Sequence, residues 1–248
     1  DEQGQGSLFI RGANTVDLIT ADGTEYMARF QVDGYNKLYH DGSERLETSS
    51  SGVTVTGNVI SNDGSNNARF QFDNNNMILI ENDTALYLYV NGSASLKVDS
   101  IGAVTMPTQP AFLARPSSVQ ANFSINSNVT IVFDTEIFDQ NGDFASNTFT
   151  APVTGKYQLN FTVTLKNMDT AAVYYVIKLV TSNREHQSII DPDYFDSDAA
   201  WFPMHHSVLA DMDANDTAYI TIYQSAGTAQ TDLEYVSGRT AFSGYLVA

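Results

Sequence analysis

Short runs of β-branched and aromatic residues, each bounded by Gly, Asn, Asp or Ser, fill almost all of this 248-residue chain. Such runs are typical of β-strands joined by tight turns. No segment carries apolar residues at intervals of three and four for long enough to form a substantial helix. With 42% hydrophobic residues, 13 Tyr and 14 Phe, the chain can also bury a core. The sequence therefore predicts an all-β fold.

The formal net charge of −17 excludes several classes of partner. Binding to a nucleic-acid backbone requires clustered Lys and Arg, and this chain has 12 basic residues among 29 acidic ones. Anionic membrane surfaces are disfavoured for the same reason. No apolar run approaches the roughly 20 residues that a membrane-spanning helix needs. The chain has no cysteine, so its stability has to come from core packing or from association.

Composition divides the chain into an N-terminal region, residues 1–106, and a C-terminal region, residues 107–248. The N-terminal region is rich in Gly, Asn and Ser and contains a weak repeat, in which Arg29-Phe30-Gln31 matches Arg69-Phe70-Gln71 at a spacing of forty. A unit of a few short strands buries too little apolar surface to offset about 1–2 kcal/mol of backbone entropy per residue. Stacked repeats of a solenoid, or three intertwined chains, would each solve the problem. Two units are few for a solenoid, which favours an intertwined stalk.

Part of the N-terminal region resembles a segment of tail-fibre and structural proteins of marine and cyanobacterial phages. The resemblance covers Asn36 to Gly64, about thirty residues. It is carried by Leu38-Tyr39, Asp41, Ser43, Leu46-Glu47-Thr48 and the run from Gly52 to Gly57. The resemblance implies a phage fibre in which this segment lies between a shaft and a tip.

Two strands of the C-terminal region have different patterns. From Lys156 to Lys166 apolar residues alternate with polar ones, which predicts a strand with one face on a core and the other in water. From Ala171 to Val180 both faces are apolar, with Val173 and Tyr175 on one face and Ala172 and Tyr174 on the other, and Ala218 to Tyr223 is similar. Such strands need a second cover, either neighbouring subunits about a threefold axis or a folded-over loop or N-terminal region. The candidate trimer-interface residues are Tyr174, Val176, Val180, Tyr219 and Tyr223.

The C-terminal region also resembles C1q-like domains, which are jelly-roll heads of trimeric proteins. The resemblance is carried by Phe133, Asp139, Phe144, Phe149, Gly155, Tyr157, Phe161, and by the closing strand with Phe242 and Gly244. Two features depart from the family pattern: Leu159 replaces an aromatic residue, and the gap between Phe144 and Phe149 is short. The resemblance implies a C1q-like β-sandwich of about 140 residues, assembled as a homotrimer.

The most concentrated charge lies between two predicted strands of the C-terminal region. Four carboxylates there could bind calcium, a hard cation that prefers oxygen ligands, or could line a solvated loop: Asp191, Asp193, Asp196 and Asp198. Aromatic residues flank them, and rings beside carboxylates suit a saccharide. The candidate receptor or glycan site is Asp193, Tyr194, Phe195, Asp196 and Trp201. The alternative is that Trp201 and Phe202 fill the core.

The chain carries no Gly-x-Ser-x-Gly elbow, no phosphate-binding glycine loop and no zinc-binding His pair at helical spacing, so we do not expect an enzyme. His205 and His206 are adjacent in a predicted strand and point to opposite faces. The sequence predicts a fibre protein on a virion surface, which attaches the virion to a host-surface glycan or protein and contacts other virion proteins. The alternatives are a structural capsid or neck fibre, and a secreted C1q-like lectin or ligand of a cellular organism.

Overall fold

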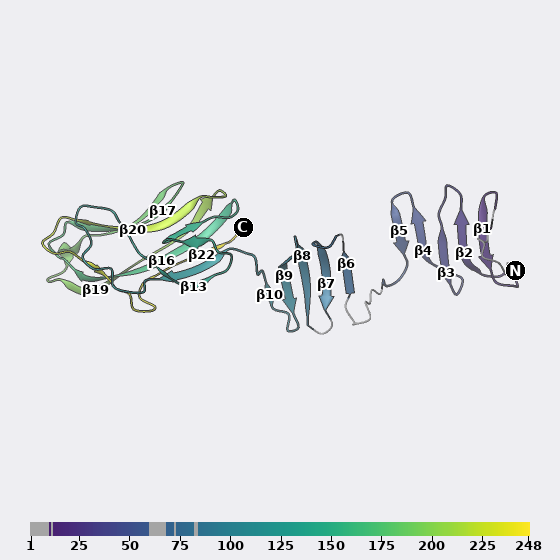
Figure 1. Ribbon diagram of the computed structural model, residues 1–248, viewed down its shortest axis with the longest axis horizontal. Coiled ribbons are helices and arrows are strands. Elements are labelled where there is room, and N and C mark those ends of the chain that lie inside the picture. The colour runs from purple at the N-terminus through teal and green to yellow at the C-terminus, as the bar shows by residue number, and fades with distance from the viewer. Residues whose placement is uncertain (1–9, 11, 60–67, 72, 82–83) are drawn as a thin grey trace. The chain divides into compact units, whose positions relative to one another are not determined.

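The computed structural model describes residues 10, 12–59, 68–71, 73–81 and 84–248. Throughout these residues the regular elements are β-strands, with one short 3₁₀ helix, η1 (Pro192–Tyr194), so the expected all-β fold is confirmed. The chain divides into two compact units, residues 1–69 and residues 70–248 (Figure 1). None of the described helical residues forms a segment long and apolar enough to cross a membrane.

The first sheet is a five-stranded antiparallel meander, drawn as a single layer in Figure 1. Its strands follow chain order and each is short: β1 (Thr15–Ile19), β2 (Tyr26–Gln31), β3 (Lys37–His40), β4 (Ser43–Ser49) and β5 (Gly52–Val55). Asp41 and Gly42 turn β3 into β4 with φ of 52° and 66°. Two positive φ angles are what a tight hairpin turn requires, and Asp-Gly satisfies them at low cost. The phage-like segment lies largely in β3–β5, and its residues 60–64 lie outside the described residues.

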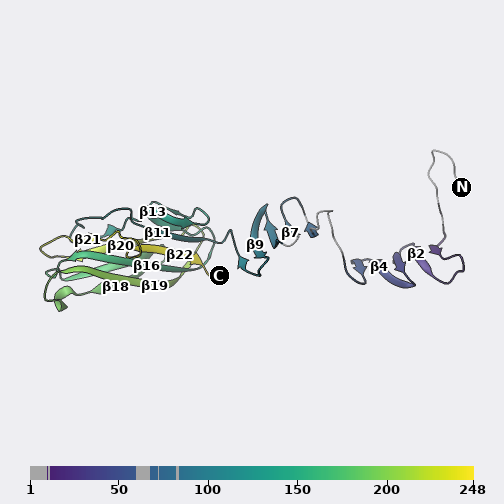
Figure 2. The same cartoon turned by 90° about the horizontal axis from the view of Figure 1, so that it is seen from below.

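The second sheet, seen edge-on in Figure 2, is also a five-stranded meander. It contains β6 (Ala68–Gln71), β7 (Met77–Glu81), β8 (Ala85–Val90), β9 (Ser93–Asp99) and β10 (Val104–Thr105). Asn91 and Gly92 turn β8 into β9 with φ of 50° and 77°, as Asp41 and Gly42 do in the first sheet.

The two sheets repeat each other at a spacing of fifty residues, and the predicted spacing of forty is wrong. Leu38 pairs with Leu46 across β3 and β4, and fifty residues later Leu88 pairs with Leu96 across β8 and β9. Each register shifts after the first leucine of the pair. The forty-residue match fails because it aligns Phe30 in the second strand of one sheet with Phe70 in the first strand of the other.

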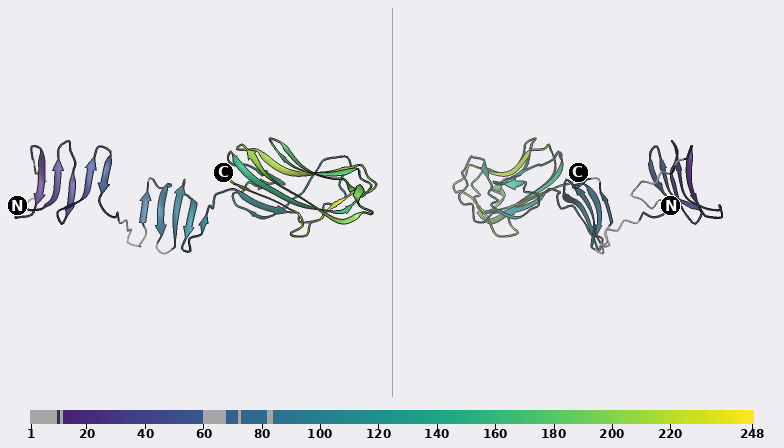
Figure 3. Two further views of the ribbon diagram at one scale, coloured as in Figure 1. Left: turned by 180° about the vertical axis from the view of Figure 1, so that it is seen from behind. Right: turned by 45° about the vertical axis from the view of Figure 1, so that its right-hand side comes forward.

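Strands β11 to β22 form a two-layered sandwich, seen from two further directions in Figure 3. The first layer, the β16 sheet, runs in the order β13 (Thr135–Asp139), β11 (Ala111–Arg115), β22 (Ala241–Leu246), β16 (Gly155–Met168) and β19 (Ala199–Met212), with β21 (Asp232–Leu233) beside β16. The second layer, the β17 sheet, runs β14 (Phe144–Ala145), β15 (Thr148–Thr150), β20 (Thr217–Ser225), β17 (Tyr174–Thr181) and β18 (Glu185–Ile190), with β12 (Val129–Thr130) beside β20.

The core of the sandwich contains the aromatic residues singled out in the sequence. Phe112 stacks on Phe144 and Phe149 at ring-centroid distances of 4.9 and 4.8 Å. The signature aromatics are all buried: Phe133, Phe144, Phe149, Tyr157, Phe161 and Phe242. Asp139 is polar for a local reason, because its carboxylate accepts the backbone N–H groups of Asp143 and Phe144 and so holds the turn into β14.

The alternation predicted for Lys156 to Lys166 is confirmed, since Tyr157, Leu159 and Phe161 are buried in β16 and the residues between them are partly exposed. The prediction for Ala171 to Val180 needs correction at its start. Val173 is 56% exposed and Ala172 is fully buried, the reverse of what strand alternation through them requires. The reason is that both residues belong to the turn before β17, which begins only at Tyr174.

Candidate functional site

The acidic loop joins β18 to β19 at the end of the sandwich away from the start of β11. The position follows from the register, because β19 begins with Ala199 opposite Met168, the last residue of β16. The carboxylate of Asp191 caps η1 by accepting the backbone N–H of Asp193 at 3.0 Å, and Pro192 is buried beneath the turn. The loop therefore has a defined conformation, and it holds Tyr194 outward with 90% of its surface exposed.

The far side of the loop is attached to the turn between β16 and β17. Asp198 accepts hydrogen bonds from the backbone N–H and the hydroxyl of Thr170, at 2.9 and 2.8 Å. The Phe195 ring packs edge-on against Phe202, with centroids 5.5 Å apart. These contacts anchor the acidic loop to the sandwich, and Tyr194 projects from the loop.

The four aspartates proposed as calcium ligands are not brought together. Asp191 accepts an N–H of the loop itself, and Asp198 accepts hydrogen bonds from Thr170 in the turn between β16 and β17. Throughout the described part of the chain no three His, Asp or Glu side chains lie close enough to hold a metal ion. The geometry fits the solvated loop better than the calcium site.

Trp201 lies on the opposite face of β19 from Phe202, because successive side chains of a strand point to opposite sides. Its indole N–H donates to the Glu234 carboxylate at 3.1 Å, and its ring is 56% exposed. The Arg239 guanidinium lies 5.6 Å from the ring centroid and 3.7 Å from the same carboxylate. The structure therefore separates Trp201 from the Tyr194–Phe195 loop and places it in a different cluster.

Glu234 is the buried centre of this cluster, which we call the tryptophan cluster (Trp201, Glu234 and Arg239). Its side chain is only 6% exposed. Burial raises the pKa of Glu234, but hydrogen bonds from the backbone of Tyr235 and from the Trp201 indole outweigh burial and hold the pKa below its ordinary value. The carboxylate is therefore charged at neutral pH and fixes the edge of the indole.

A shallow cavity of about 370 Å³ lies beside the tryptophan cluster. Its walls are Thr162, Thr164, Trp201, Pro203, His205, Gly238 and Arg239. An aromatic face, a guanidinium and two threonine hydroxyls can bind a sugar or an acidic side chain. Sequence reasoning identified Trp201 but missed Glu234 and Arg239, because 33 and 38 residues separate them from it in the chain and no local pattern links them.

The two adjacent histidines point to opposite faces of the β16 sheet, as expected. His205 faces outward, where its Nδ1 lies 3.0 Å from the Thr162 hydroxyl. His206 faces the interior, stacked on Phe161 and with its ring centroid 6.2 Å from that of His186 on β18.

The five candidate trimer-interface residues do share one surface, the outer face of the β17 sheet. Val176 pairs with Tyr223, Val180 pairs with Tyr219, and Tyr174 stacks on Tyr223 at 6.0 Å. This mutual contact leaves Val176 only 6% exposed and the other four half-buried in the single chain. On the β16 sheet, by contrast, Leu209 and Tyr245 flank Gln158 on the outer face and are 54% and 50% exposed.

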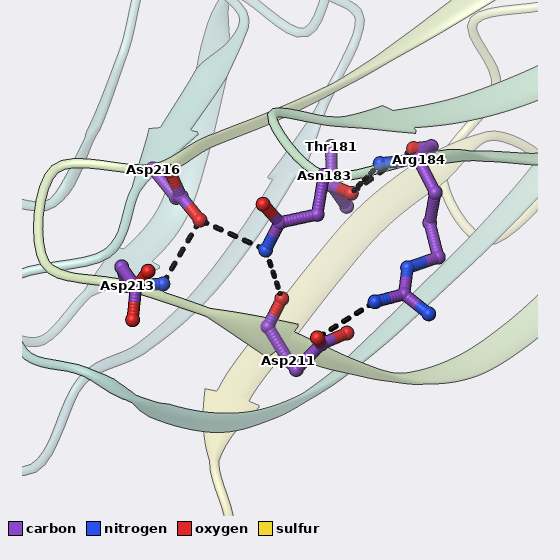
Figure 4. Close-up of polar contacts among 6 residues, drawn as sticks. All are labelled: Thr181, Asn183, Arg184, Asp211, Asp213 and Asp216. Atoms are coloured by element: carbon purple, nitrogen blue, oxygen red, sulfur yellow. Dashed lines mark hydrogen bonds and ion pairs between the residues drawn. The ribbon is translucent and has the colours of Figure 1, made fainter.

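A cluster of polar contacts lies at the other end of the sandwich and has a structural role (Figure 4). Asn183 donates to the backbone oxygen of Asp211 at 2.9 Å and to the carboxylate of Asp216 at 3.1 Å. Arg184 pairs with the Asp211 carboxylate at 2.7 Å, and Asp216 also accepts the backbone N–H of Asp213. These contacts join the β17–β18 hairpin to the β19–β20 turn. They also occupy the polar groups that would otherwise be free to bind a ligand.

The two-layered antiparallel sandwich defines the fold class of this part of the chain. Residues 111–247 match the model of the C1q domain. Because the match covers more than half of the chain, the chain belongs to the C1q domain family. Domains of this family are non-enzymatic modules that form trimers and bind ligands or receptors.

Solved structures match part of the chain at low sequence identity. The globular domain of zebrafish complement 1qA protein is 18% identical, and the match covers 56% of this chain and 98% of that chain with a TM-score of 0.40. Murine APRIL is 12% identical, and the match covers 56% of this chain and 99% of that chain with a TM-score of 0.42. No curated protein matches the chain.

Proposed function

We propose that this protein is a homotrimeric viral fibre whose C1q domain attaches the virion to a host-cell surface. One observation carries the proposal: a C1q domain follows two five-stranded sheets that expose apolar side chains, among them Leu18, Leu38 and Ile80. The resemblance of residues 36–64 to a phage fibre segment supports the viral setting. Leu38-Tyr39 and Leu46 of this segment recur fifty residues later as Leu88-Tyr89 and Leu96, so the second sheet carries the same pattern. The protein acts by multivalent adhesion, in which three weak sites per fibre give avidity beyond a single contact.

The receptor surface we propose is the β18–β19 loop with Asp193, Tyr194, Phe195 and Asp196. Tyr194 is the most exposed aromatic side chain in the described residues, and its backbone is held by η1. An exposed ring on a rigid support loses little conformational entropy on binding and can cover the apolar face of a sugar or a protein side chain. Trp201 belongs to the β16 sheet face and so to a different contact.

The trimer contact we propose is the outer face of the β16 sheet. Leu209, Tyr245 and Trp201 are half exposed there in the single chain, and association would cover them. The β17 face offers less, because its tyrosines and valines already cover one another. Leu209→Glu should lower the fraction of trimer measured by light scattering, whereas Tyr223→Glu should leave that fraction unchanged.

Binding can be tested on a printed glycan array and on intact cells of candidate hosts. Tyr194→Ala should reduce the signal at least tenfold, and Tyr35→Ala, at a tyrosine that is 51% exposed between β2 and β3, should not change it. Equal binding by both variants would rule out the loop as the receptor surface.

The viral setting needs a separate experiment. Gold-labelled antibodies against the chain should decorate fibre tips on intact virus particles. Label on capsid vertices or necks, away from any receptor-binding tip, would favour a structural fibre. A protein found only free in the medium of a cellular organism would instead be a secreted C1q ligand, and the fibre proposal would fail.

A further inference from the structure

The two faces of the first sheet have opposite chemistry. Partners in register point to the same side of a sheet, so the pairing defines rows across the strands. One row crosses all five strands and is wholly apolar: Leu18, Ala28, Leu38, Leu46 and Val55. The adjacent row lies on the other face and is wholly polar: Asp17, Arg29, Lys37, Glu47 and Thr54.

The charged side chains of the polar face pair with one another. Arg29 pairs with Asp17 at 2.8 Å, and its guanidinium lies 4.5 Å over the Tyr26 ring. Lys37 pairs with Glu44 at 2.8 Å and lies 3.8 Å from Glu47. A face of paired charges is stable in water and has no need of a protein cover.

The apolar face has no such arrangement. Leu18, Leu38 and Val55 are 45%, 44% and 40% exposed, and Phe30, which pairs with Val16 on the same face, is 47% exposed. A contiguous apolar surface of this kind is rare on a monomer and marks an interaction site. A single-layer sheet of short strands also has no second layer with which to form a core.

The second sheet also has an apolar face. Its apolar face carries two rows: Ile80, Leu86, Val98 and Val104, and Ile78, Leu88 and Leu96. Ile80, Leu88 and Val104 are 48%, 42% and 57% exposed. The row on the opposite face is Leu79, Tyr87, Lys97 and Thr105, in which Leu79 is buried and Lys97 lies 5.6 Å over the Tyr87 ring.

We propose that the apolar face of each sheet packs against the same face of two other copies of this chain, about a threefold axis. The rows carry no charge, so identical faces can meet although each chain has a net charge of −17. The same kind of face occurs twice in one chain, and a second copy presents both faces in the same order along its sequence. The proposal rests on the proposed function only for the number of chains, because the C1q domain of the same polypeptide sets that number at three.

The absence of cysteine makes cross-linking a direct test on the full chain. Leu38→Cys and Leu88→Cys place one thiol on the apolar face of the first and second sheet. Thr54→Cys and Thr105→Cys are the matched controls, each on the face of its sheet opposite the leucine. A short bis-maleimide reagent should link chains in the two leucine variants and not in the two threonine variants, as seen on a denaturing gel.

The stoichiometry identifies the symmetry. Three thiols around one axis allow only one link per trimer, so the linked product is a dimer and one chain in three stays single. Complete conversion to dimer would instead mean a twofold sandwich and would overturn the threefold arrangement. Equal linking of leucine and threonine variants, or none in either, overturns the assignment of the faces.

Light scattering on the unmodified chain separates this inference from the proposed function. A trimeric mass with no cross-linking at Leu38→Cys leaves the C1q trimer standing and removes the sheet contact. A mass of one chain removes both. Circular dichroism of each variant checks that the strand content is unchanged.

Discussion

The carboxylate of Asp169 accepts a backbone hydrogen bond from Ala229 at 2.7 Å, although Asp169 is only 2% exposed. Its other oxygen accepts the backbone N–H of Ala171 at 2.9 Å. Burial raises the pKa of Asp169, but the N–H donors of Ala229, Ala171 and Thr228 outweigh burial and hold it below the ordinary value of 3.8. The side chain thereby joins the β16–β17 turn to the loop after β20, beneath the end that carries the proposed receptor loop.

Asp169→Asn should destabilise the sandwich by about 2–3 kcal/mol, because a charged acceptor of several hydrogen bonds is replaced by an amide whose NH₂ group faces N–H donors. Urea unfolding at pH 7 measures the difference. Asp193→Asn, at an exposed position of the same end, is the control and should change the free energy of unfolding by less than about 0.5 kcal/mol. Equal effects of the two substitutions would contradict the role assigned to Asp169.

Acid should lower the free energy of unfolding partly by protonating Asp169. Its pKa is lower in the folded than in the unfolded chain, so its stabilisation is complete above the unfolded value of 3.8 and is lost as the pH falls through the folded value. Between pH 7 and 5 we expect no contribution from this group. Below pH 4 the free energy of unfolding should fall less steeply in Asp169→Asn than in the wild type. Parallel curves of this free energy against pH would contradict the prediction.

Local periodicity was enough to predict the strands but not the tryptophan cluster. Tyr157, Leu159 and Phe161 alternate in β16 because one face of that strand meets the core, and this is visible in ten residues of sequence. The contact of Trp201 with Glu234 depends on where β21 and the following turn lie along β16, which is set by tertiary packing. Likewise, identical letters aligned Phe30 with Phe70, whereas hairpin register makes Leu38 equivalent to Leu88.

His186 should make the sandwich sensitive to mild acid. Its Nε2 is buried without a hydrogen-bond partner within the described structure. Burial lowers the pKa of His186 from its ordinary value of 6.5, and His206 and Arg184 lower it further against a smaller opposing effect of Asp211. Because the pKa of His186 is lower in the folded than in the unfolded chain, its contribution to stability is complete above the unfolded value of 6.5. The contribution is lost as the pH falls through the pKa of the folded chain.

His186→Leu should therefore lose less stability than the wild type between pH 7.5 and pH 5.5. The midpoint of urea unfolding at the two pH values is the measurement. His40→Leu, at an exposed position in β3, controls for the general loss of a histidine and should keep the wild-type difference. A wild-type difference retained by His186→Leu would show that this histidine does not cause it.

Gly244 should tolerate no side chain. A Cβ at this position would lie 2.5 Å from Cδ2 of Leu159 and 2.8 Å from the ring of Phe112, both in the packed core. Gly244→Ala should cost about 1–3 kcal/mol through overpacking. Thermal unfolding followed by circular dichroism measures the loss, and Ser243→Ala, one residue earlier in β22 and half-buried, should have a much smaller effect.

Trp201 is the only tryptophan of the chain, so its fluorescence reports directly on the tryptophan cluster. The emission depends on the Glu234 carboxylate, which accepts the indole N–H and is held in the charged form by a pKa below its ordinary value of 4.5. The emission should therefore stay constant from pH 7 to pH 5 and change only below pH 4.5, where protonation weakens the hydrogen bond. Glu234→Gln should remove that change, because glutamine does not titrate, while Arg239→Ala should keep it. A titration unchanged in Glu234→Gln would assign the pH response to another group and leave the orientation of Trp201 without its proposed cause.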